Sequence, residues 1–233
     1  MATHFVDNVQ KLPPAVKTVC DFRPPVNDVL EQEALASTYP TGSVLFTEGQ
    51  AARGVFIVRR GRVKLSICGS DGRTLILRIV EAGCPLGVAA VVSGRQYEAT
   101  AETQEPCEIS FLRQSDLLRL MRLHGELAVW VTQHISQDYA YTCREIRDLI
   151  LSDSASERLA RLLVGWLDQN TTAINPSQMT LPSTHEEIGQ MIGSTRVTVS
   201  RLFADFRKQH LIQQNGSTLV IPDRLALESL IAA

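Results

Sequence analysis

Short apolar runs separated by glycines fill the chain from about residue 42 to residue 112. Nine of the 14 glycines lie between residues 42 and 94, and the runs between them, such as VFIVRRG and TLILRIVEAG, are rich in β-branched residues. Short strands punctuated by turn residues at this spacing predict an antiparallel β-roll or barrel. The segment Gly69-Ser70-Asp71-Gly72 predicts a hairpin turn inside it, because Asp-Gly tolerates a positive φ.

The pattern then changes to a helical period, and the longest helix is predicted from Glu126 to Leu151. Its largely apolar stripe, spaced by three or four residues, consists of Val131, Ile135, Thr142, Ile146 and Leu149. A helix of about 26 residues is roughly 39 Å long and exceeds a small domain. We therefore expect part of the stripe to face a second copy of the chain, and packing against the β-roll is the alternative. The polar residues Gln137, Asp138 and Tyr141 in its middle could meet a ligand or form hydrogen bonds.

The sharpest motif is LPSTHEEIGQMIGSTRVTVSRLFADFRK, in the C-terminal part of the chain. Thr184 and Glu187 fit a capping box, Thr-x-x-Glu, which opens a short helix. Gly193 fits the left-handed residue that ends such a helix, and Ser194 or Thr195 caps the next one. Helix, glycine-containing turn and helix form the helix-turn-helix pattern.

A hairpin is predicted after the two helices. Asn215-Gly216 lies between the apolar runs Leu211-Ile212 and Leu219–Ile221, which is a strong hairpin signal. The module is therefore predicted to be a winged helix-turn-helix, whose second helix enters the major groove of DNA. A helix over Ala155–Gln169 is predicted before it, after a break at Ser152–Ser154 that indicates a hinge.

Two arginines of the second helix carry the predicted DNA chemistry. Arg196 and Arg201 can lie on one side of that helix, and an arginine donates two parallel hydrogen bonds to guanine O6 and N7. Thr198 and Ser200 can reach a phosphate or a base, and Val197 can contact a thymine methyl group. The predicted DNA-binding residues are Thr184, Ser194, Thr195, Arg196, Val197, Thr198, Ser200, Arg201 and Lys208.

The net charge of the whole chain does not indicate a nucleic-acid partner, but the charge of one segment does. The chain of 233 residues has 44% hydrophobic and 21% charged residues, which is the composition of an ordinary globular protein. Its formal net charge of −2 excludes a uniformly basic nucleic-acid binder. Residues 194–210, however, carry four basic side chains against Asp205, a local net charge of +3. DNA binding would therefore depend on a field that is confined to one helix.

The sequence offers no catalytic or metal-binding arrangement. No Ser/His/Asp set, phosphate-binding loop or metal-ligand spacing occurs, so we predict neither an enzyme nor a bound cofactor. No apolar run approaches the roughly 18 residues that span a membrane, and no signal pattern opens the chain. A cytoplasmic protein without a membrane partner is expected. The five scattered cysteines fit reduced thiols and are Cys20, Cys68, Cys84, Cys107 and Cys143.

The order of β-roll, long helix and winged helix-turn-helix resembles the Crp/Fnr family of bacterial transcription regulators over nearly the whole chain. GSVLFTEGQ, VFIVRRGRVKL and GSTRVTVSRL carry the likeness, and GSTRVTVSRL is most similar to the NtcA-like nitrogen regulators. The resemblance implies an α+β fold: an N-terminal cyclic-nucleotide-binding-like β-roll (jelly roll), a long dimerisation helix and a C-terminal winged helix-turn-helix. It also implies a homodimer, a palindromic site on double-stranded DNA and RNA polymerase as a partner. The expected parts are an extension (1–25), the sensory roll (26–124), the dimerisation helix (125–152) and the DNA-binding domain (153–233).

The chain departs from the cyclic-AMP branch of this family at several positions. Members of that branch have Gly-Glu-Leu followed about ten residues later by Arg-Ser-Ala, where this chain has Gly87-Val88-Ala89 and Tyr97-Glu98-Ala99. The first segment lacks the carboxylate that holds the ribose. The second lacks the arginine that pairs with the phosphate, and Glu98 would repel that phosphate. Cyclic AMP is therefore not expected to bind in the usual mode. Val197 replaces a glutamate that helps cyclic-AMP receptors read DNA, so a half-site identical to theirs is not expected either.

Other effectors stay open. Arg95 could hold an organic acid, a role that would resemble the NtcA-like regulators. The long helix lacks an obvious second arginine at the matching place, although Arg144 is near, and a pocket closed by side chains is the alternative. Candidates for haem ligation or a redox pair are His124, His134, Cys84 and Cys143. A small-molecule-binding regulatory protein whose main role is not DNA binding is the alternative function. The effector-pocket candidates are Gly87, Val88, Arg95, Tyr97, Glu98, Ala99 and Arg144.

Overall fold

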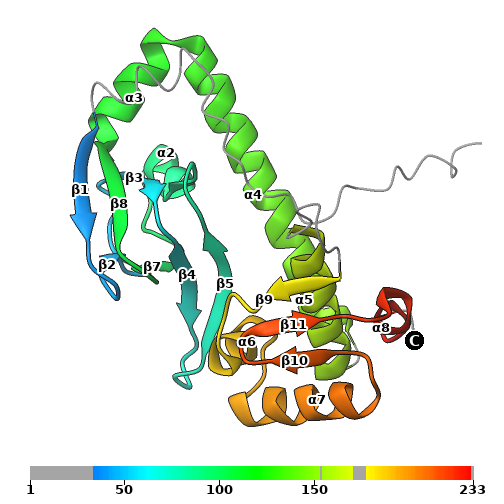
Figure 1. The fold of residues 1–233 in the computed structure, drawn as a ribbon. Helices are drawn as coiled ribbons and strands as arrows, with labels where there is room; N and C mark the ends of the chain where they lie inside the picture. The colour runs from blue at the N-terminus through cyan, green and yellow to red at the C-terminus, as the bar shows by residue number, and fades with distance from the viewer. Residues whose placement is uncertain (1–33, 153, 170–176, 232–233) are drawn as a thin grey trace, which may run out of the picture.

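The computed structural model describes residues 34–152, 154–169 and 177–231. In chain order, its elements form a β-rich unit, a long helix and a smaller mixed unit towards the C-terminus (Figure 1). This arrangement confirms the predicted α+β class. The expected extension over residues 1–25 and the first residues of the expected roll lie outside the described residues.

Antiparallel strands build the β-rich unit. They are β1 (Leu35–Tyr39), β2 (Val44–Phe46), β3 (Gly54–Arg60), β4 (Val63–Cys68), β5 (Thr74–Val80), β6 (Pro85–Leu86), β7 (Thr100–Thr103) and β8 (Cys107–Arg113). One sheet has the strand order β1-β8-β3-β6 and the other β2-β7-β4-β5, which confirms the predicted roll. The turn from β4 to β5 has Gly72 at a φ of 79°, as the predicted Asp-Gly hairpin requires. The core of the roll includes Val58, Val63, Leu65 and Ile109.

Three helices lie with the roll: α2 (Val88–Ser93), α3 (Gln114–Leu123) and α4 (Gly125–Leu151). The predicted long helix is α4, which begins one residue earlier than expected. The helix α2 was not predicted, because six residues are too few to show a helical period. Gly87 and Gly94 flank α2 with φ values of 79° and 69°, so these glycines bound a helix within the β-rich unit.

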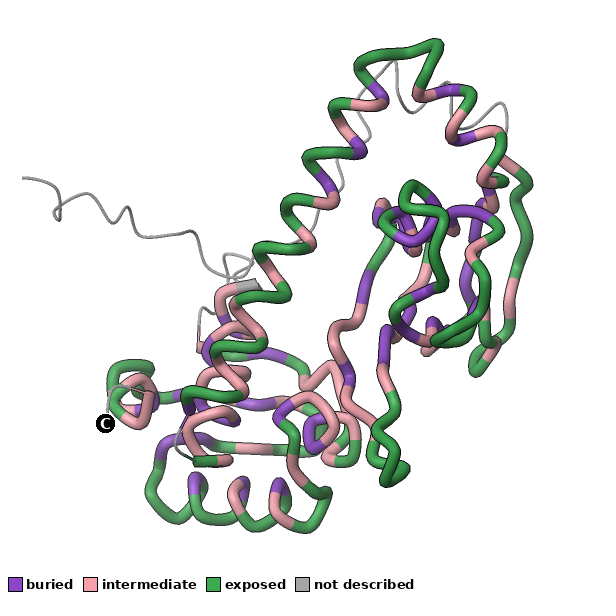
Figure 2. Tube along the Cα trace, turned by 180° about the vertical axis from the view of Figure 1, so that it is seen from behind, coloured by how far each residue is buried: buried purple, intermediate pink, exposed green. Residues whose placement is uncertain are grey.

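The first half of α4 packs against the roll. Val131 is 1% exposed, and Ile135 lies at the edge of the same cluster. The other members of this cluster include Val55, Ile57, Leu112, Leu117 and Leu127. For Val131 and Ile135 the alternative therefore holds, because these residues pack against the roll, whereas Thr142 and Ile146 of the same stripe are exposed. That the exposed part of the stripe faces a second copy stays a prediction. Figure 2 shows that the opposite side of α4 is exposed.

The C-terminal unit combines helices with a small sheet. Its elements are α5 (Ala155–Gln169), β9 (Gln178–Thr180), α6 (His185–Met191), α7 (Arg196–Lys208), β10 (Gln213–Asn215), β11 (Thr218–Val220) and α8 (Arg224–Ser229). The hairpin of β10 and β11 turns at Gly216, as predicted. The sheet order is β10-β11-β9, and β9 was not predicted, because three residues are too few to show an alternating pattern. The core of the unit includes Leu159, Leu163, Ile188, Phe203 and Leu219.

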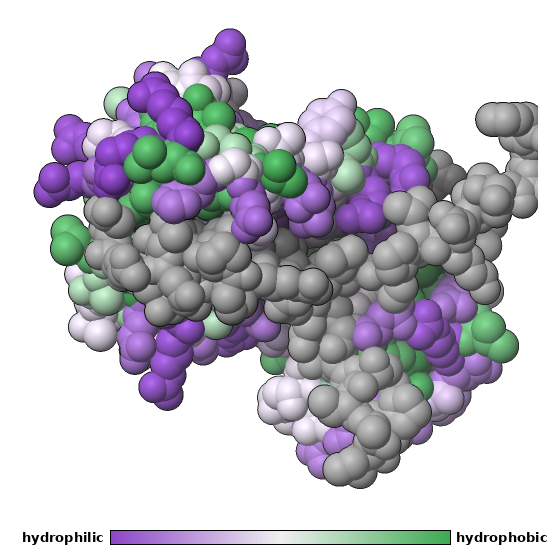
Figure 3. All heavy atoms as spheres, turned by 90° about the horizontal axis from the view of Figure 1, so that it is seen from above, coloured by the Kyte–Doolittle hydropathy of each residue, from purple (hydrophilic) through white to green (hydrophobic). Residues whose placement is uncertain are grey.

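The surface mixes both kinds of side chain. In the view from above, hydrophilic and hydrophobic residues are interspersed over the described part of that face (Figure 3). Among the helices in the described ranges, none combines the length and the apolar character needed to cross a bilayer.

Candidate DNA-binding interface and effector region

Local hydrogen bonds fix the turn between α6 and α7. The N–H of Thr184 donates to Glu187 Oε2 at 2.8 Å, and the N–H of Glu187 donates to Thr184 Oγ1 at 3.3 Å, which confirms the predicted capping box. Gly193 has a φ of 62°, and the N–H of Ser194 donates to the Gly189 carbonyl at 2.7 Å. A Cβ at residue 189 would lie 3.0 Å from the Ser194 carbonyl oxygen. The close approach of the turn to α6 therefore depends on the missing side chain of Gly189.

Thr195, and not Ser194, caps α7. Its Oγ1 accepts a hydrogen bond from the N–H of Thr198 at 3.2 Å. The hydroxyl groups of Thr195 and Thr198 also lie 3.0 Å apart. This result resolves the two alternatives that the sequence left open for the start of the helix.

A buried face and an exposed face divide α7. Its buried residues are Val199, Phe203 and Phe206, which belong to the core of the C-terminal unit. Thr198 is half-buried, and the exposed candidates are Arg196, Val197, Ser200, Arg201 and Lys208. The spacing of four residues between Val199 and Phe203 places both side chains on this buried face. That the exposed residues contact DNA stays a prediction.

Two sequence models of known families match this chain at the two units just described. The model of the cyclic nucleotide-binding domain matches residues 36–124, and the model of the Crp-like helix-turn-helix domain matches residues 157–230. The chain belongs to the Crp/Fnr family. The protein is therefore a Crp/Fnr-type DNA-binding transcription regulator with an N-terminal cyclic nucleotide-binding domain.

Curated relatives within the Crp/Fnr family align over most of the chain. The "cAMP-activated global transcriptional regulator CRP" of Haemophilus influenzae is 29% identical over 200 residues, which are 85% of this chain and 89% of that protein. The "Global nitrogen regulator" of Synechocystis is 26% identical over 197 residues, 83% of this chain and 87% of that protein. The second likeness weakly supports the predicted similarity to nitrogen regulators.

Solved structures show the same Crp/Fnr fold. FixK2 from Bradyrhizobium japonicum has a TM-score of 0.73 at 24% identity and covers 86% of this chain and 98% of its own. A CooA mutant from Carboxydothermus hydrogenoformans has the same TM-score and identity, and the match covers 88% of this chain and 90% of the CooA chain. These likenesses confirm the predicted order of roll, long helix and helix-turn-helix.

Tyr97 fills part of the predicted effector region. Its side chain is 3% exposed, and its hydroxyl donates to the Gly54 carbonyl at 2.6 Å and accepts from the N–H of Gly54 at 3.3 Å. Its ring stacks on that of Phe46 with centroids 4.0 Å apart. A Cβ on Gly87 would lie 2.5 Å from the Tyr97 ring, so the ring rests on the backbone of residue 87. Burial raises the pKa of Tyr97, so the hydroxyl keeps its proton.

The other pocket candidates lie in different environments. Val88 and Ala99 are buried in the roll, whereas Arg95 and Glu98 are exposed. Arg144 is half-buried on α4. The structure thus brings Gly87 and Tyr97 into contact, and effector binding by any of these residues stays a prediction.

A polar cluster that the sequence analysis did not find joins the roll to α4. Both Nη atoms of Arg78 on β5 donate to the carboxylate of Asp138, at 2.7 and 3.1 Å. Burial alone would lower the pKa of Arg78, but the hydrogen bonds and the charge of Asp138 raise it above its ordinary value. The ring centroid of Tyr141 lies 5.8 Å from the Arg78 guanidinium carbon, and His134 Nε2 lies 3.3 Å from Asp138 Oδ2. The sequence predicts that Asp138 and Tyr141 form hydrogen bonds or meet a ligand. It does not identify Arg78 as their partner, because Arg78 is about 60 residues away along the chain.

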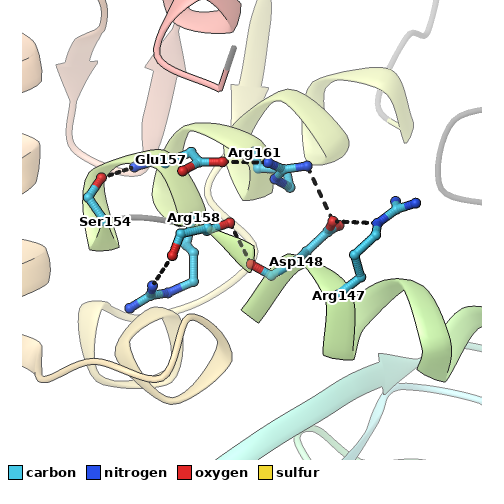
Figure 4. Close-up of polar contacts among 7 residues, drawn as sticks. Arg147, Asp148, Ser154, Glu157, Arg158 and Arg161 are labelled. Atoms are coloured by element: carbon cyan, nitrogen blue, oxygen red, sulfur yellow. Dashed lines mark hydrogen bonds and ion pairs between the residues drawn. The ribbon is translucent and has the colours of Figure 1, made fainter. Parts of the chain in front are cut away.

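Side chains of α5 bond to the end of α4 (Figure 4), and one of them also bonds to the helix-turn-helix. Arg161 donates to Asp148 Oδ1 on α4 at 3.2 Å and to Glu157 Oε1 at 2.6 Å. Arg158 Nε donates to the Ile192 carbonyl, at the C-terminal end of α6, at 2.7 Å. The predicted hinge therefore lies inside a hydrogen-bonded junction, although residue 153 itself is outside the described residues.

The remaining candidates for haem or redox chemistry are dispersed. Cys84 is buried in the core of the roll, whereas Cys143 is exposed on α4. His124 is exposed, and the buried ring of His134 stacks on Trp130 with centroids 5.6 Å apart. Burial lowers the pKa of His134 against the opposing charge of Asp138, so the ring is neutral near pH 7.

Proposed function

We propose that the protein is a homodimeric transcription regulator that reads a palindromic DNA site, and whose β-roll does not bind cyclic AMP in the usual mode. One observation supports sequence-specific DNA binding. The exposed face of α7, inside the matched Crp-like domain, presents Arg196 and Arg201 to solvent. Each of these arginines can donate a bidentate pair to a guanine. The local net charge of +3 attracts phosphates although the whole chain has a net charge of −2.

The exposed side of α4 supports the homodimer through residues 125–152. Exposed residues follow one another at alternating steps of three and four, and they are Val129, Thr132, Ser136, Tyr139, Cys143, Ile146 and Ile150. This spacing is the a/d pattern of a two-stranded coiled coil. Tyr139 is 72% and Ile150 73% exposed in the single chain, so large side chains lack cover within the described part of one copy. A second α4 would cover them.

Packing in the roll supports the proposal about cyclic AMP. Tyr97 stands where the resemblance expects the phosphate-pairing arginine, and its hydroxyl is committed to Gly54. Arg78, a half-buried cation of the roll, is bonded to Asp138. The Haemophilus influenzae relative is named as activated by cyclic AMP, and this chain differs from the expected cassette at Val88, Tyr97 and Glu98. An effector of another class would have to bind the DNA-competent arrangement more tightly than the other to shift the equilibrium.

We place this activity in the bacterial cytoplasm, with RNA polymerase as a further partner and with no enzymatic reaction. The support is the family membership and the names of the curated relatives, which are transcriptional and nitrogen regulators. Residues 26–124 would act as the sensor, 125–152 as the dimerisation helix and 153–233 as the DNA-binding domain.

Selection from random duplexes tests both halves of the proposal. The full-length protein is used to enrich DNA with and without cyclic AMP, and the enriched sequences are compared. We expect one motif with two inverted half-sites about 10 base pairs apart, centre to centre, enriched equally in both arms. Absence of an enriched motif would contradict DNA reading, and enrichment only with cyclic AMP would contradict the proposal about the sensor.

A further inference from the structure

His185, the first residue of α6, connects the two helices of the helix-turn-helix. Its Nδ1 lies 3.0 Å from Ser200 Oγ on α7. Its half-buried ring stacks on Phe203, with centroids 4.6 Å apart and an interplanar angle of 28°. Because Ser200 occupies Nδ1 and Phe203 covers one face, the ring is held in one orientation and Nε2 is the nitrogen available to a partner.

Basic side chains of α7 act on this ring. Arg196, Ser200 and Arg207 are separated by four and seven residues, so they share the side of α7 to which His185 is bonded. Burial lowers the pKa of His185, and the positive charges of Arg196 and Arg207 lower it further. Both arginines are exposed. The group therefore forms a basic site of two guanidinium groups beside a neutral imidazole.

Ionisable groups of the neighbouring elements are bonded to other partners or lie exposed to solvent. Glu187 is committed to the capping box, and Glu186 is exposed on α6. Arg78, the ionisable residue of β5, which packs beside α6, is paired with Asp138. After burial, Arg196 and Arg207 are thus the charges that oppose the uptake of a proton by His185.

We propose that His185 binds a backbone phosphate of the DNA duplex through Nε2 as an imidazolium, so that each subunit takes up a proton when DNA binds. This inference rests on the proposed DNA-binding function. In a helix-turn-helix the second helix enters the groove while the first crosses the backbone. A phosphate at the basic site offsets the repulsion from Arg196 and Arg207 and adds an attraction of its own. The imidazole then becomes a better base in the complex than in the free protein.

The sign of the pH dependence follows from this change. The pKa of His185 is lowered in the free protein, and the phosphate raises it in the complex. Between the two pKa values the complex holds more protons, so affinity rises as pH falls, and it levels off below the lower pKa. A difference of one pKa unit corresponds to about tenfold in affinity for each histidine, and a dimer contributes two.

Fluorescence anisotropy of the full-length protein on a selected palindromic duplex tests the proposal, at constant ionic strength from about pH 8 to pH 6. The wild type is expected to bind about tenfold or more tightly at the lower pH. In His185→Asn the amide can keep the bond to Ser200 but cannot become charged, so its affinity should change less than about threefold over this range. His185→Arg should bind at the higher pH about as tightly as the wild type at the lower pH. His124→Gln, an exposed substitution outside the C-terminal unit, should keep the wild-type slope.

The outcomes separate the inference from the function on which it rests. If the wild type binds the duplex but His185→Asn keeps the wild-type slope, the inference is wrong and the proposed function stands. A pH-dependent His185→Arg would also contradict the inference, and this variant decides the matter if His185→Asn fails to fold. If the wild type shows no preference for the palindromic duplex at any pH, the proposed function itself fails.

Discussion

The guanidinium of Arg201 lies in solvent on the face of α7 opposite Val199 and Phe203. Among the described residues no ion pair engages it. Binding to a base would therefore break no internal bond of the protein. Lys208 is exposed as well, but it lies in the last turn of α7, whereas a recognition helix reads bases mainly with its N-terminal residues.

Replacement of Arg201 by alanine should reduce the sequence specificity of DNA binding. We expect Arg201→Ala to cost about 1–3 kcal/mol on the selected duplex and to relax the preference at one guanine in each half-site. Lys208→Ala is the matched control, and it should weaken binding to specific and random duplexes by the same factor. Competition anisotropy with both kinds of DNA measures the difference. An equal loss for Arg201→Ala on both kinds would show that Arg201 does not read a base.

Residues whose partners lie close in sequence could be predicted. The capping box of Thr184 and Glu187 and the turn at Gly193 follow from spacing alone. The bond from Tyr97 to Gly54 and the contact of His185 with Ser200 depend on which segments the fold brings together. Composition and local pattern carry no information on such pairings, so these contacts required the structure.

The helix α4 has one side that packs against the roll and an opposite side that is exposed. One side of its first half completes the core of the roll through Leu127 and Val131. The polar residues of its middle meet β5, and the opposite side is exposed. The helix and its length could be predicted because the period is sustained. The role of each side could not, since several apolar and polar positions recur at similar spacings.

The pair of Arg78 and Asp138 should couple β5 to α4 energetically. We expect Arg78→Met and Asp138→Asn each to lower the free energy of unfolding, and the double variant to lose about 1–3 kcal/mol less than the sum of the two. The physical reason is that either single variant leaves a partly buried charge without its counterpart, since the side chains of Arg78 and Asp138 are 15% and 33% exposed. Urea unfolding of all four proteins measures the coupling.

The pair of Arg73 and Asp71 supplies the control for this cycle. Arg73 is 88% exposed, and solvent screens such a pair. Its double-mutant cycle, made with Arg73→Met and Asp71→Asn, should give a coupling near zero. Additive losses for Arg78 and Asp138 would contradict a structural link between the roll and α4.

At the scale of the whole molecule, the exposed side of α4 runs from the roll towards the DNA-binding unit (Figures 1 and 2). A dimer along this side would fix two recognition helices relative to each other. The contacts of Arg158 and Arg161 at the junction would transmit the position of α4 to the helix-turn-helix. The order of the three parts could be predicted from the sequence because each part has its own period.

A charge in the exposed side of α4 should disrupt the dimer. Ile150→Asp removes an apolar contact worth about 1.5–3 kcal/mol from each chain, so the dimer should weaken by about 100-fold or more. Sedimentation velocity at micromolar concentration is expected to show a monomer. Circular dichroism is expected to show unchanged secondary structure. Gln137→Asp, an exposed change on α4 outside the a/d positions, is the matched control and should stay dimeric. A dimeric Ile150→Asp would mean that another surface holds the chains together.

Two copies of this chain are proposed to read two inverted half-sites as one rigid unit. The most direct test of this proposal is the affinity of the full-length protein for the selected palindrome and for the same palindrome with five base pairs inserted at its centre. Half a helical turn rotates one half-site to the opposite side of the duplex. We expect two chains on the original duplex and an affinity about 100-fold or more lower for the longer one. Equal affinity for both duplexes, or one chain bound to each, would contradict the proposal.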